Sequence, residues 1–223
     1  MIKSVSIDTV SRPSVVRALA LSAIHDEILQ NGYRAMTLES LAARAGVSDD
    51  AMRGVFVSKE SVLTAHLDRM GDSLISLLSG IARSSAPVRE RLRECLLARV
   101  TFRFDVLRPY RAYLHEMREP LLLAMRHRAP EQFEREEGIV AHLVAEGQRT
   151  GAFDFGDPVP TARTLLTATG ALLPSESDLT ALPSFTDLYR TAGRLIDIVL
   201  EGLVRKHWAM PRQESPRIDA TAL

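Results

Sequence analysis

Apolar residues recur at intervals of three and four along most of the chain, and this helical periodicity limits the possible folds more than any other feature. Leu21, Ile24 and Ile28 illustrate the pattern, which stops at Asn31-Gly32, a pair that commonly ends helices. Few runs alternate apolar with polar residues, as half-buried strands do. The sequence therefore predicts an all-α fold.

Capping residues and prolines divide the chain into predicted helices. Thr37, Ser48 and Ser58 suit the N-cap position, where a side-chain oxygen accepts a hydrogen bond from a first-turn N–H. From Pro87 onward we interpret each proline as a helix start, because proline fits the first helical turn and disfavours helix in the residue before it. The predicted helices are 14–31, 37–46, 48–55, 58–83, 87–107, 109–118, 120–128, 130–150, 161–173 and 185–207.

Length and composition place the chain among globular proteins. Its 223 residues suit one domain or a small domain joined to a larger one, and 46% hydrophobic with 25% charged residues argues against intrinsic disorder. The single cysteine, Cys95, excludes an intramolecular disulfide and is interpreted as a buried, inert thiol. No segment has the apolar length of a signal peptide or a membrane span, so we expect a cytoplasmic protein with no membrane partner.

Two short predicted helices flank a four-residue turn, the layout of a helix-turn-helix. In that turn glycine permits the sharp bend, valine anchors it in the core, and serine caps the second helix. The turn and the residues spaced around it are Gly32, Thr37, Leu41-Ala42, Ala45-Gly46-Val47-Ser48, Phe56, Ser58-Lys59-Glu60 and Val62-Leu63. From about Leu21 to Leu63 this series resembles the N-terminal domain of the TetR family of bacterial transcriptional regulators.

The resemblance implies an organisation and a function for the whole chain. It implies a three-helix helix-turn-helix DNA-binding domain at 1–58, ordered from about 12, joined by a long helix to an all-helical effector-binding and dimerisation domain at 59–210. A disordered tail is expected at 211–223. The implied function is that of a ligand-responsive regulator, a repressor, which binds a palindromic double-stranded DNA operator as a homodimer and is released by a small molecule. Neither enzyme activity nor a cofactor is expected.

The predicted recognition helix departs from the pattern of the family it resembles. Such helices usually read Ser-Lys-Gly-Thr-Leu-Tyr, whereas here Asp49 and Asp50 follow Ser48. Phosphates repel carboxylates, but a carboxylate also accepts a hydrogen bond from cytosine N4 in the major groove, with Arg53 taking guanine or a phosphate. Two interpretations stay open: a sequence-specific DNA reader, or a protein of this fold that has lost operator binding and serves as a small-molecule-binding or protein-binding module. The candidate DNA-binding residues are Arg34, Thr37, Ser48, Asp49, Asp50, Ala51, Arg53, Gly54 and Lys59.

Charge is unevenly distributed although the formal net charge is zero. Residues 1–70 hold eight basic and eight acidic side chains, so strong non-specific attraction to DNA is not expected. Residues 83–128 hold eleven arginines and five acidic residues, whereas 129–201 hold five arginines and twelve acidic residues. The arginines either bind an anionic effector, such as a carboxylate or an acyl thioester, or pair with the acidic helices that follow.

Aromatic and sulfur-bearing side chains cluster within the arginine-rich stretch, where they are candidates for lining a pocket between helices. The candidate effector-binding residues are Phe102, Phe104, Tyr110, Tyr113, Met117 and Met125. His115 and Glu119 lie at i and i+4, but the segment lacks the second histidine of a zinc-protease helix. No metal site is therefore expected.

The helix predicted at 185–207 is apolar on two sides, so it needs two neighbouring helices. Together with the helix at 161–173 it is expected to form a four-helix dimer interface, and the alternative is an ordinary monomeric core. The candidate interface residues are Leu165, Leu166, Leu172, Leu195, Ile196, Val199 and Leu203.

Overall fold

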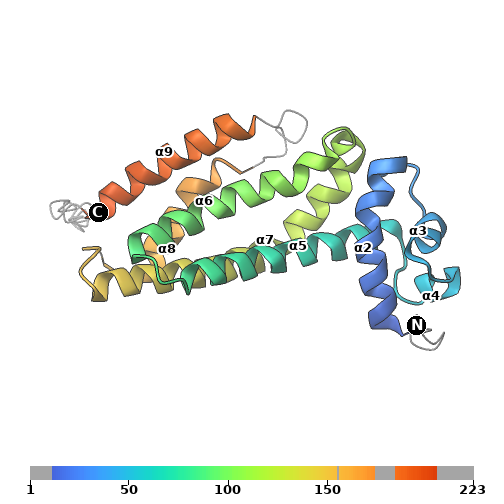
Figure 1. The fold of residues 1–223 in the computed structure, drawn as a ribbon, viewed down its shortest axis with the longest axis horizontal. Helices are drawn as coiled ribbons and strands as arrows, with labels where there is room; N and C mark the ends of the chain where they lie inside the picture. The colour runs from blue at the N-terminus through green and yellow to red at the C-terminus, as the bar shows by residue number, and fades with distance from the viewer. Residues whose placement is uncertain (1–11, 155, 174–183, 205–223) are drawn as a thin grey trace, which may run out of the picture.

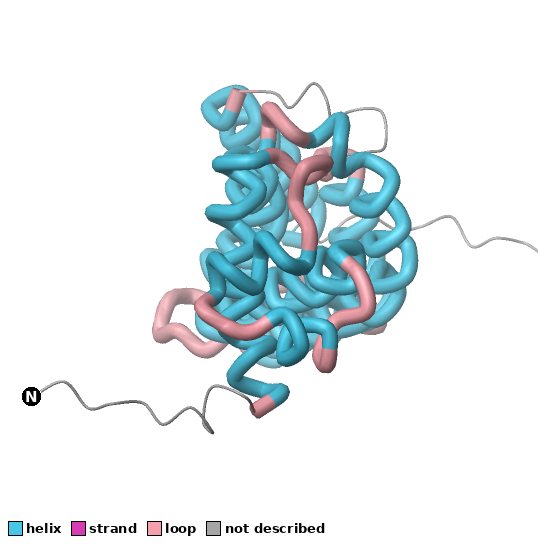
Figure 2. The backbone as a smooth tube through the Cα atoms, turned by 90° about the vertical axis from the view of Figure 1, so that its right-hand side faces the viewer, coloured by secondary structure: helices cyan, strands magenta, loops and turns pink. Residues whose placement is uncertain are grey.

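The computed structural model describes residues 12–154, 156–173 and 184–204. Within these ranges Figure 2 shows helices and connecting loops but no strand, which confirms the predicted all-α class. The stretch 174–183 and the predicted tail at 211–223 lie outside the described residues. In chain order the elements are α2 (Pro13–Asn31), α3 (Leu38–Ala45), α4 (Asp49–Arg53), α5 (Lys59–Ala82), α6 (Val88–Leu107), η1 (Arg108–Tyr110), α7 (Leu114–Arg149), α8 (Pro158–Gly170) and α9 (Phe185–Val204).

Helices α2, α3 and α4 form a small cluster at one end of an elongated molecule (Figure 1). Helix α5 packs against α2 at this end and then runs along the rest of the molecule, where it packs against α6 and α7. Helix α9 packs on α6, and α8 packs on α7. One long helix therefore joins the three-helix cluster to a larger helical bundle, as the fold class predicted.

Short-range polar contacts begin two helices at the predicted positions. The Thr37 hydroxyl accepts a hydrogen bond from the Ser40 backbone N–H, and the Ser40 hydroxyl accepts one from the Thr37 N–H. Ser58 and Ser61 make the same reciprocal pair at the start of α5. Each pair satisfies N–H groups that would otherwise lack a partner at a helix start, so residues three apart in sequence fix both starts.

Helix α7 corrects the prediction that every proline begins a new helix. Separate helices were expected at 109–118, 120–128 and 130–150, but the structure has one helix from Leu114 to Arg149 with Pro120 and Pro130 inside it. An interior proline removes one intrahelical hydrogen bond and presses on the preceding turn, which bends a helix. The axis of α7 does turn along its length in Figure 1. Packing against α5 and α8 outweighs the local preference of these prolines.

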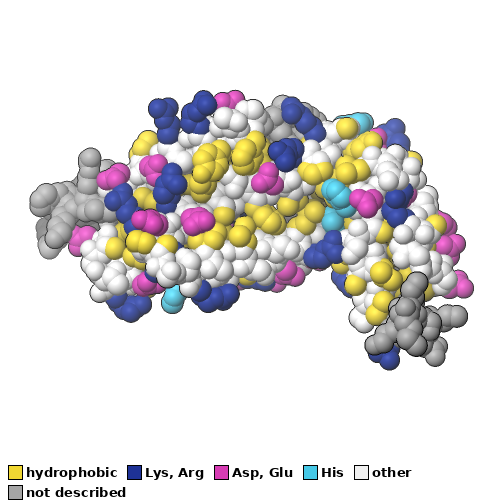
Figure 3. All heavy atoms as spheres, in the orientation of Figure 1, with side chains coloured by type: hydrophobic (Ala, Val, Ile, Leu, Met, Phe, Trp, Pro, Cys, Tyr) yellow, Lys and Arg dark blue, Asp and Glu magenta, His cyan; other side chains and the backbone are white. Residues whose placement is uncertain are grey.

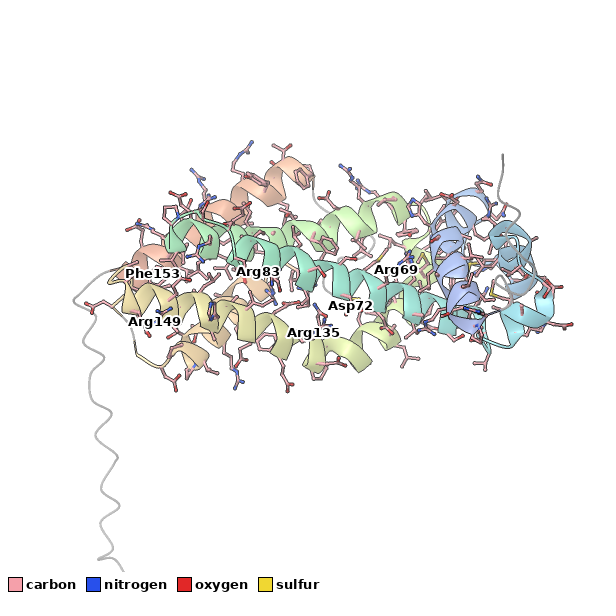
Figure 4. The ribbon with its side chains drawn as sticks, turned by 60° about the horizontal axis from the view of Figure 1, so that its bottom comes forward. Arg69, Asp72, Arg83, Arg135, Arg149 and Phe153 are labelled. Carbon is pink, nitrogen blue, oxygen red and sulfur yellow. The ribbon has the colours of Figure 1, made fainter. Side chains whose placement is uncertain are left out.

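The chain folds back on itself where α7 ends. Gly151 adopts a left-handed φ of 73°, and the Phe153 ring then packs on the last turn of α7 near the end of the molecule labelled in Figure 4. A Cβ on Gly147 would lie 2.0 Å from Cδ2 of Phe153, so only glycine leaves room for the ring. The Asp154 N–H donates to the Leu203 carbonyl at 3.3 Å, which ties this turn to α9.

In the described ranges, no helix combines the length and the apolar character that crossing a bilayer requires.

Candidate nucleic-acid interface and internal cavity

The turn between α3 and α4 has the geometry of a helix-turn-helix. Gly46 adopts the left-handed conformation (φ 68°, ψ 33°) that ends α3, and the Val47 N–H donates to the Ala42 carbonyl at 3.1 Å. The Ser48 hydroxyl then accepts from the Ala51 N–H at 3.3 Å and starts α4. Because side chains with a Cβ rarely adopt a positive φ, the glycine at this point decides the angle between the two helices.

Two buried apolar side chains hold α4 on the cluster while its polar side chains face outward. Met52 is fully buried and Phe56 nearly so. The remaining candidates in this segment are exposed except for Ala51, which is half-buried; the exposed ones are Ser48, Asp49, Asp50, Arg53 and Gly54. The structure therefore brings these predicted DNA-binding residues together on one accessible surface, which we call the α4 surface.

Acidic side chains gather at the end of the molecule formed by α3 and α4 (Figure 3). Asp49 and Asp50 are exposed, and neither forms an ion pair or hydrogen bond with a side chain elsewhere in the described residues. Arg53, the cation of this helix, donates instead to the Glu39 carboxylate on α3. The α4 surface thus carries two uncompensated negative charges and one arginine already engaged within the protein.

The two candidate phosphate contacts outside α4 are also held by the protein's own groups. The Lys59 ammonium donates to the carbonyls of Tyr33 and Arg34, each at 3.0 Å, and lies 4.8 Å from the centre of the Tyr33 ring. The Thr37 hydroxyl accepts the capping hydrogen bond from Ser40. Lys59 keeps one N–H for a phosphate, and the Thr37 hydroxyl keeps its own proton to donate.

Arg34 lies at the joint between the three-helix cluster and the bundle. Its side chain is exposed, while its backbone N–H donates to the Glu116 carboxylate of α7 at 2.8 Å. The Tyr113 hydroxyl, just before α7, donates to the Leu29 carbonyl of α2 at 3.1 Å. Both contacts attach the C-terminal end of α2 and the loop after it to the start of α7.

A second part of the joint is a polar relay around Tyr110, which η1 carries between α2 and α5. Its hydroxyl lies 2.8 Å from Nδ1 of His25 and 3.1 Å from Nε2 of His66. Arg69, labelled at the α2 end of α5 in Figure 4, donates to the Leu21 carbonyl, and its Nη2 lies 3.4 Å from Nδ1 of His66. Tyr110 therefore connects the two histidine rings. Burial first, and the neighbouring Arg69 and His25 after it, lower the pKa of His66 to about 4.

The bundle contains a cavity of about 350 Å³ between α5, α6 and α7. Most of its wall is apolar, with Leu67, Met70 and Leu74 from α5 facing Phe102 and Val106 from α6. Leu107 and Leu121 lie in its wall on either side of the segment that carries the joint residues. A cavity of this volume, mostly apolar with a few polar groups, has the character of a small-molecule site.

One end of the cavity is charged. Glu136 of α7, with no exposed surface, accepts hydrogen bonds from Arg99 at 2.5 Å and from Arg103 at 2.6 Å. Gln132 donates to the same carboxylate at 3.1 Å. These four side chains line the cavity, and none of them is among the residues predicted from the sequence. The signal that pointed toward them was the opposite charge of 83–128 and 129–201.

Two of the six candidate effector residues line this cavity, namely Phe102 and Met125. The other four lie outside its wall, and their part in effector binding stays a prediction. Phe104 and Met117 are buried in the hydrophobic core, and Tyr110 and Tyr113 serve the joint because their hydroxyls find partners on α2.

The arginine-rich and acidic halves of the bundle pair with one another. Arg91 donates to Glu146, Arg93 to Asp197, and Arg89 to Glu201. Together with Arg99 and Arg103 on Glu136, these contacts show that the second of the two interpretations of the charge pattern holds for five arginines of α6. An anionic effector remains a prediction.

The candidate dimer residues divide into two groups. Leu165, Leu166, Ile196 and Leu203 are buried in the protein's own core, which leaves little of their surface for a partner, and their place in an interface stays a prediction. The predicted residues that keep partial exposure are Leu172, Leu195 and Val199. Ile198, which is 71% exposed, lies on the outer side of α9 and was not selected.

No group of three or more histidine, cysteine or acidic side chains in the described ranges is arranged to hold a metal ion. His115 is 66% exposed and its nearest carboxylate is that of Glu116, at 3.9 Å. His115 and Glu119, although four residues apart on one helix, therefore form no ion pair.

The chain is similar in sequence and in fold to known proteins. Residues 20–65 match the model of a family described as bacterial regulatory proteins, tetR family. No curated protein sequence matches the chain. A solved transcriptional regulator from Cytophaga hutchinsonii is similar with a TM-score of 0.70 at 15% identity, over 84% of this chain and 98% of that one. A TetR transcription regulator from Haloarcula marismortui gives 0.66 at 18% identity, over 86% and 100%.

A transcriptional regulator of the TetR/AcrR family from Thermobifida fusca gives a TM-score of 0.59 at 24% identity, over 85% of this chain and 99% of that one. At these identities the structural similarity concerns the fold. The predicted resemblance to the TetR family is confirmed, by sequence over residues 20–65 and by fold over most of the chain.

Proposed function

We propose that this TetR-family chain is a ligand-responsive transcriptional regulator, a repressor, that acts in the cytoplasm. It binds a palindromic double-stranded DNA operator as a homodimer and is released when a small molecule fills the cavity. The observation that carries the proposal is the α4 surface, in which Gly46 and the Ser48 cap present α4 outward from a buried anchor at Met52. The proposal includes neither a catalytic role nor a cofactor.

In the proposed complex α4 enters the major groove. Asp49 and Asp50, at its N-terminus, accept hydrogen bonds from cytosine N4, and Arg53 exchanges Glu39 for guanine or a phosphate. Lys59 and Thr37, at the starts of α5 and α3, contact the flanking phosphates and fix the register. Arg34 adds an exposed cation beside them.

The homodimer would form through the outer sides of α8 and α9. Ile198 is the most exposed large apolar side chain there, and Leu195 and Val199 keep part of their surface beside it. Operator binding requires the two-fold axis through this face to place the two copies of α4 about 34 Å apart, the spacing of one DNA turn. Light scattering that gave a monomer at micromolar concentration would contradict this part of the proposal.

The segment between Leu107 and Leu121 supports a route from cavity to DNA. Both residues lie in the cavity wall, and between them Tyr110, Tyr113 and Glu116 hold α2 and the loop after it. A ligand that displaces this wall would therefore move the attachment of the three-helix cluster. Operator release then follows if the ligand binds the displaced arrangement more tightly than the DNA-bound one.

A second candidate function has its own observation. The two uncompensated carboxylates of the α4 surface and the engaged Arg53 favour a protein that no longer binds an operator and senses a small molecule for another partner. Each acidic charge near the backbone opposes the phosphate contacts that supply most of the affinity for DNA.

DNA selection on the purified full-length protein at low salt, followed by gel shift, tests the first function. An enriched palindrome supports the operator reader, and its absence supports the second candidate. The double variant Asp49→Lys with Asp50→Gly separates them further: an operator reader changes its preferred sequence, whereas the second candidate gains DNA binding it did not have. The control is Asp105→Lys with Glu94→Gln, two exposed positions on α6 that add the same charge away from α4.

A further inference from the structure

The charged end of the cavity contains more cation than anion. Arg99 and Arg103 both donate to Glu136, at 2.5 and 2.6 Å, so two guanidinium groups share one fully buried carboxylate. Arg99 completes its contacts elsewhere, since its Nη1 donates to the Leu166 carbonyl and the Thr169 hydroxyl, both at 3.1 Å. The surplus positive charge therefore falls on Arg103.

Arg103 also has a donor without an acceptor. Its Nη1 is buried and has no hydrogen-bond partner, the only such side-chain atom found among the described residues. Nearly every buried donor in a folded protein is satisfied, and leaving one unsatisfied is unfavourable. Burial lowers the pKa of Arg103, Glu136 acts against this, and Arg99 adds to the lowering. Both the hydrogen-bond count and the charge count leave room for one further anion.

The other charged groups of the wall are already engaged. Arg135 donates to Asp72 at 2.7 Å, and Figure 4 shows these two side chains reaching toward one another from α7 and α5. Asp68 and Glu131 each have an interaction of their own. The charged groups that shift the pKa of Arg103 are Glu136 and Arg99.

From this arrangement we propose that the cavity binds a compact amphipathic monocarboxylate. Its carboxylate pairs with the Arg103 guanidinium, which turns so that Nη1 reaches the cavity, and its apolar body lies against Leu74, Phe102, Leu107 and Leu121. Binding completes the charge balance of Arg99, Arg103 and Glu136 at two cations and two anions. The inference rests on the proposed function for its regulatory meaning and on the cavity alone for the binding itself.

Size and charge narrow the ligand class. At about 30 Å³ for each water-sized atom group, 350 Å³ holds on the order of a dozen non-hydrogen atoms, as in octanoate or 3-phenylpropanoate. A phosphate monoester, with a charge of about −1.5 to −2, would exceed the single surplus charge and face repulsion from Glu136. An amine would meet Arg103 and Arg99 with the same sign of charge, and an alcohol would leave that charge uncompensated.

Calorimetric titration of the full-length protein tests the proposal with two matched sets, octanoate, octanol and octylamine, and 3-phenylpropanoate, 3-phenylpropanol and 3-phenylpropylamine. We expect at least one carboxylate to bind on the order of tenfold or more tightly than its alcohol, because only the carboxylate forms a hydrogen bond between charged groups with Arg103. Neither amine should bind. Failure of both carboxylates to bind, or equal binding of acid and alcohol, would overturn the inference.

The variant Arg103→Gln adds a test at the residue itself. It leaves Arg99 and Glu136 as a balanced pair, so we expect the fold to be kept and the affinity for carboxylates to fall by about 10- to 100-fold. Arg135→Gln, another cationic residue of the wall but one paired with Asp72, is the matched control and should keep wild-type affinity. Unchanged carboxylate affinity in Arg103→Gln, with melting confirming a folded protein, would overturn the assignment.

A separate gel shift with the selected operator distinguishes this inference from the proposed function. Carboxylate binding by calorimetry without release of DNA upholds the ligand class and contradicts the regulatory role. Operator binding by a protein that binds neither carboxylate upholds the role in transcription and contradicts the ligand class.

Discussion

The contacts that stabilise the three-helix cluster join residues close together in the sequence, whereas those that stabilise the cavity-bearing bundle join residues far apart. In the cluster, helix starts depend on pairs three residues apart, such as Thr37 with Ser40. At the charged end of the cavity, Arg103 meets Glu136 across 33 residues and Arg99 meets Thr169 across 70. The first kind of contact forms within one helical turn, whereas the second requires α6, α7 and α8 to be assembled.

The two regions also carry opposite unbalanced charges. The α4 surface exposes Asp49 and Asp50 without a partner cation, and the bundle buries Nη1 of Arg103 without an acceptor. Water screens the exposed charges, so they cost the fold little and act mainly on a charged partner. The buried charge affects both stability and ligand choice, because the interior does not screen it.

The largest expected effect comes from removing the shared carboxylate of the cavity. Glu136→Gln leaves the buried Arg99 and the half-buried Arg103 without a counter-charge and should lower the free energy of unfolding by about 3–5 kcal/mol. Glu137→Gln is the control on the same helix: Glu137 is buried too, but its partner Arg163 is 64% exposed and returns to water. Its expected loss is about 1 kcal/mol or less. Urea denaturation measures both, and equal losses would contradict the distinction drawn here.

The joint between the two regions should respond to pH. The pKa of His66 is about 4 in the folded protein and 6.5 ordinarily, so as pH falls from 6.5 the unfolded chain takes up a proton first and stability decreases. The loss should reach about 3 kcal/mol near pH 4 and be absent above pH 6.5. Tyr110, His25 and Arg69, with the Leu21 carbonyl, are the groups facing this ring.

His66→Gln should flatten that dependence in thermal melts recorded between pH 7 and 4. His142→Gln, at an exposed position of α7, is the control. A wild-type profile that His66→Gln leaves unchanged would show that other groups govern stability in this range.

A smaller effect is expected at the turn of the helix-turn-helix. Gly46→Ala forces a side chain into a φ of 68° and should cost about 1–2 kcal/mol, with no steric contribution because nothing lies within 4 Å of the added Cβ. Gly80→Ala, in α5 and equally unobstructed, should instead stabilise by about 0.5–1 kcal/mol. Chemical denaturation of both variants checks that the free energy of unfolding changes in opposite directions. A stabilising Gly46→Ala would show that the positive φ does not require glycine at this position.

The smallest effect on stability is expected at the exposed ion pair of the α4 surface. Glu39→Gln should change the free energy of unfolding by about 0.2–1 kcal/mol, because both partners are about half exposed. It should nevertheless tighten binding to the selected operator, since Arg53 is then released toward DNA. Weaker binding in the gel shift would mean that Glu39 positions Arg53 for contact.

The contrast in range explains what the sequence alone could predict. Thr37, Gly46 and Ser58 were identified correctly because each acts on residues within a few positions. Arg103 was not selected, since nothing near it in sequence indicates that Glu136 would be its partner. Pro120 and Pro130 misled in the same way, because contacts with distant helices keep α7 continuous through them.

The apolar periodicity of the last helices predicts burial but not the partner that provides it. Leu165 and Ile196 were expected to be buried, and the sequence did not show whether one chain or two would bury them. Which side of a two-faced helix meets its own bundle depends on the order in which distant helices pack.

The chain's single cysteine makes the bundle observable without added labels. Cys95 of α6 is buried, its thiol donates to the Leu78 carbonyl of α5 at 3.5 Å, and burial raises its pKa to about 12. A thiol reagent can therefore reach it only when the helices around it open. The rate of modification measures this spontaneous opening of the bundle, and a molecule bound in the neighbouring cavity would slow it.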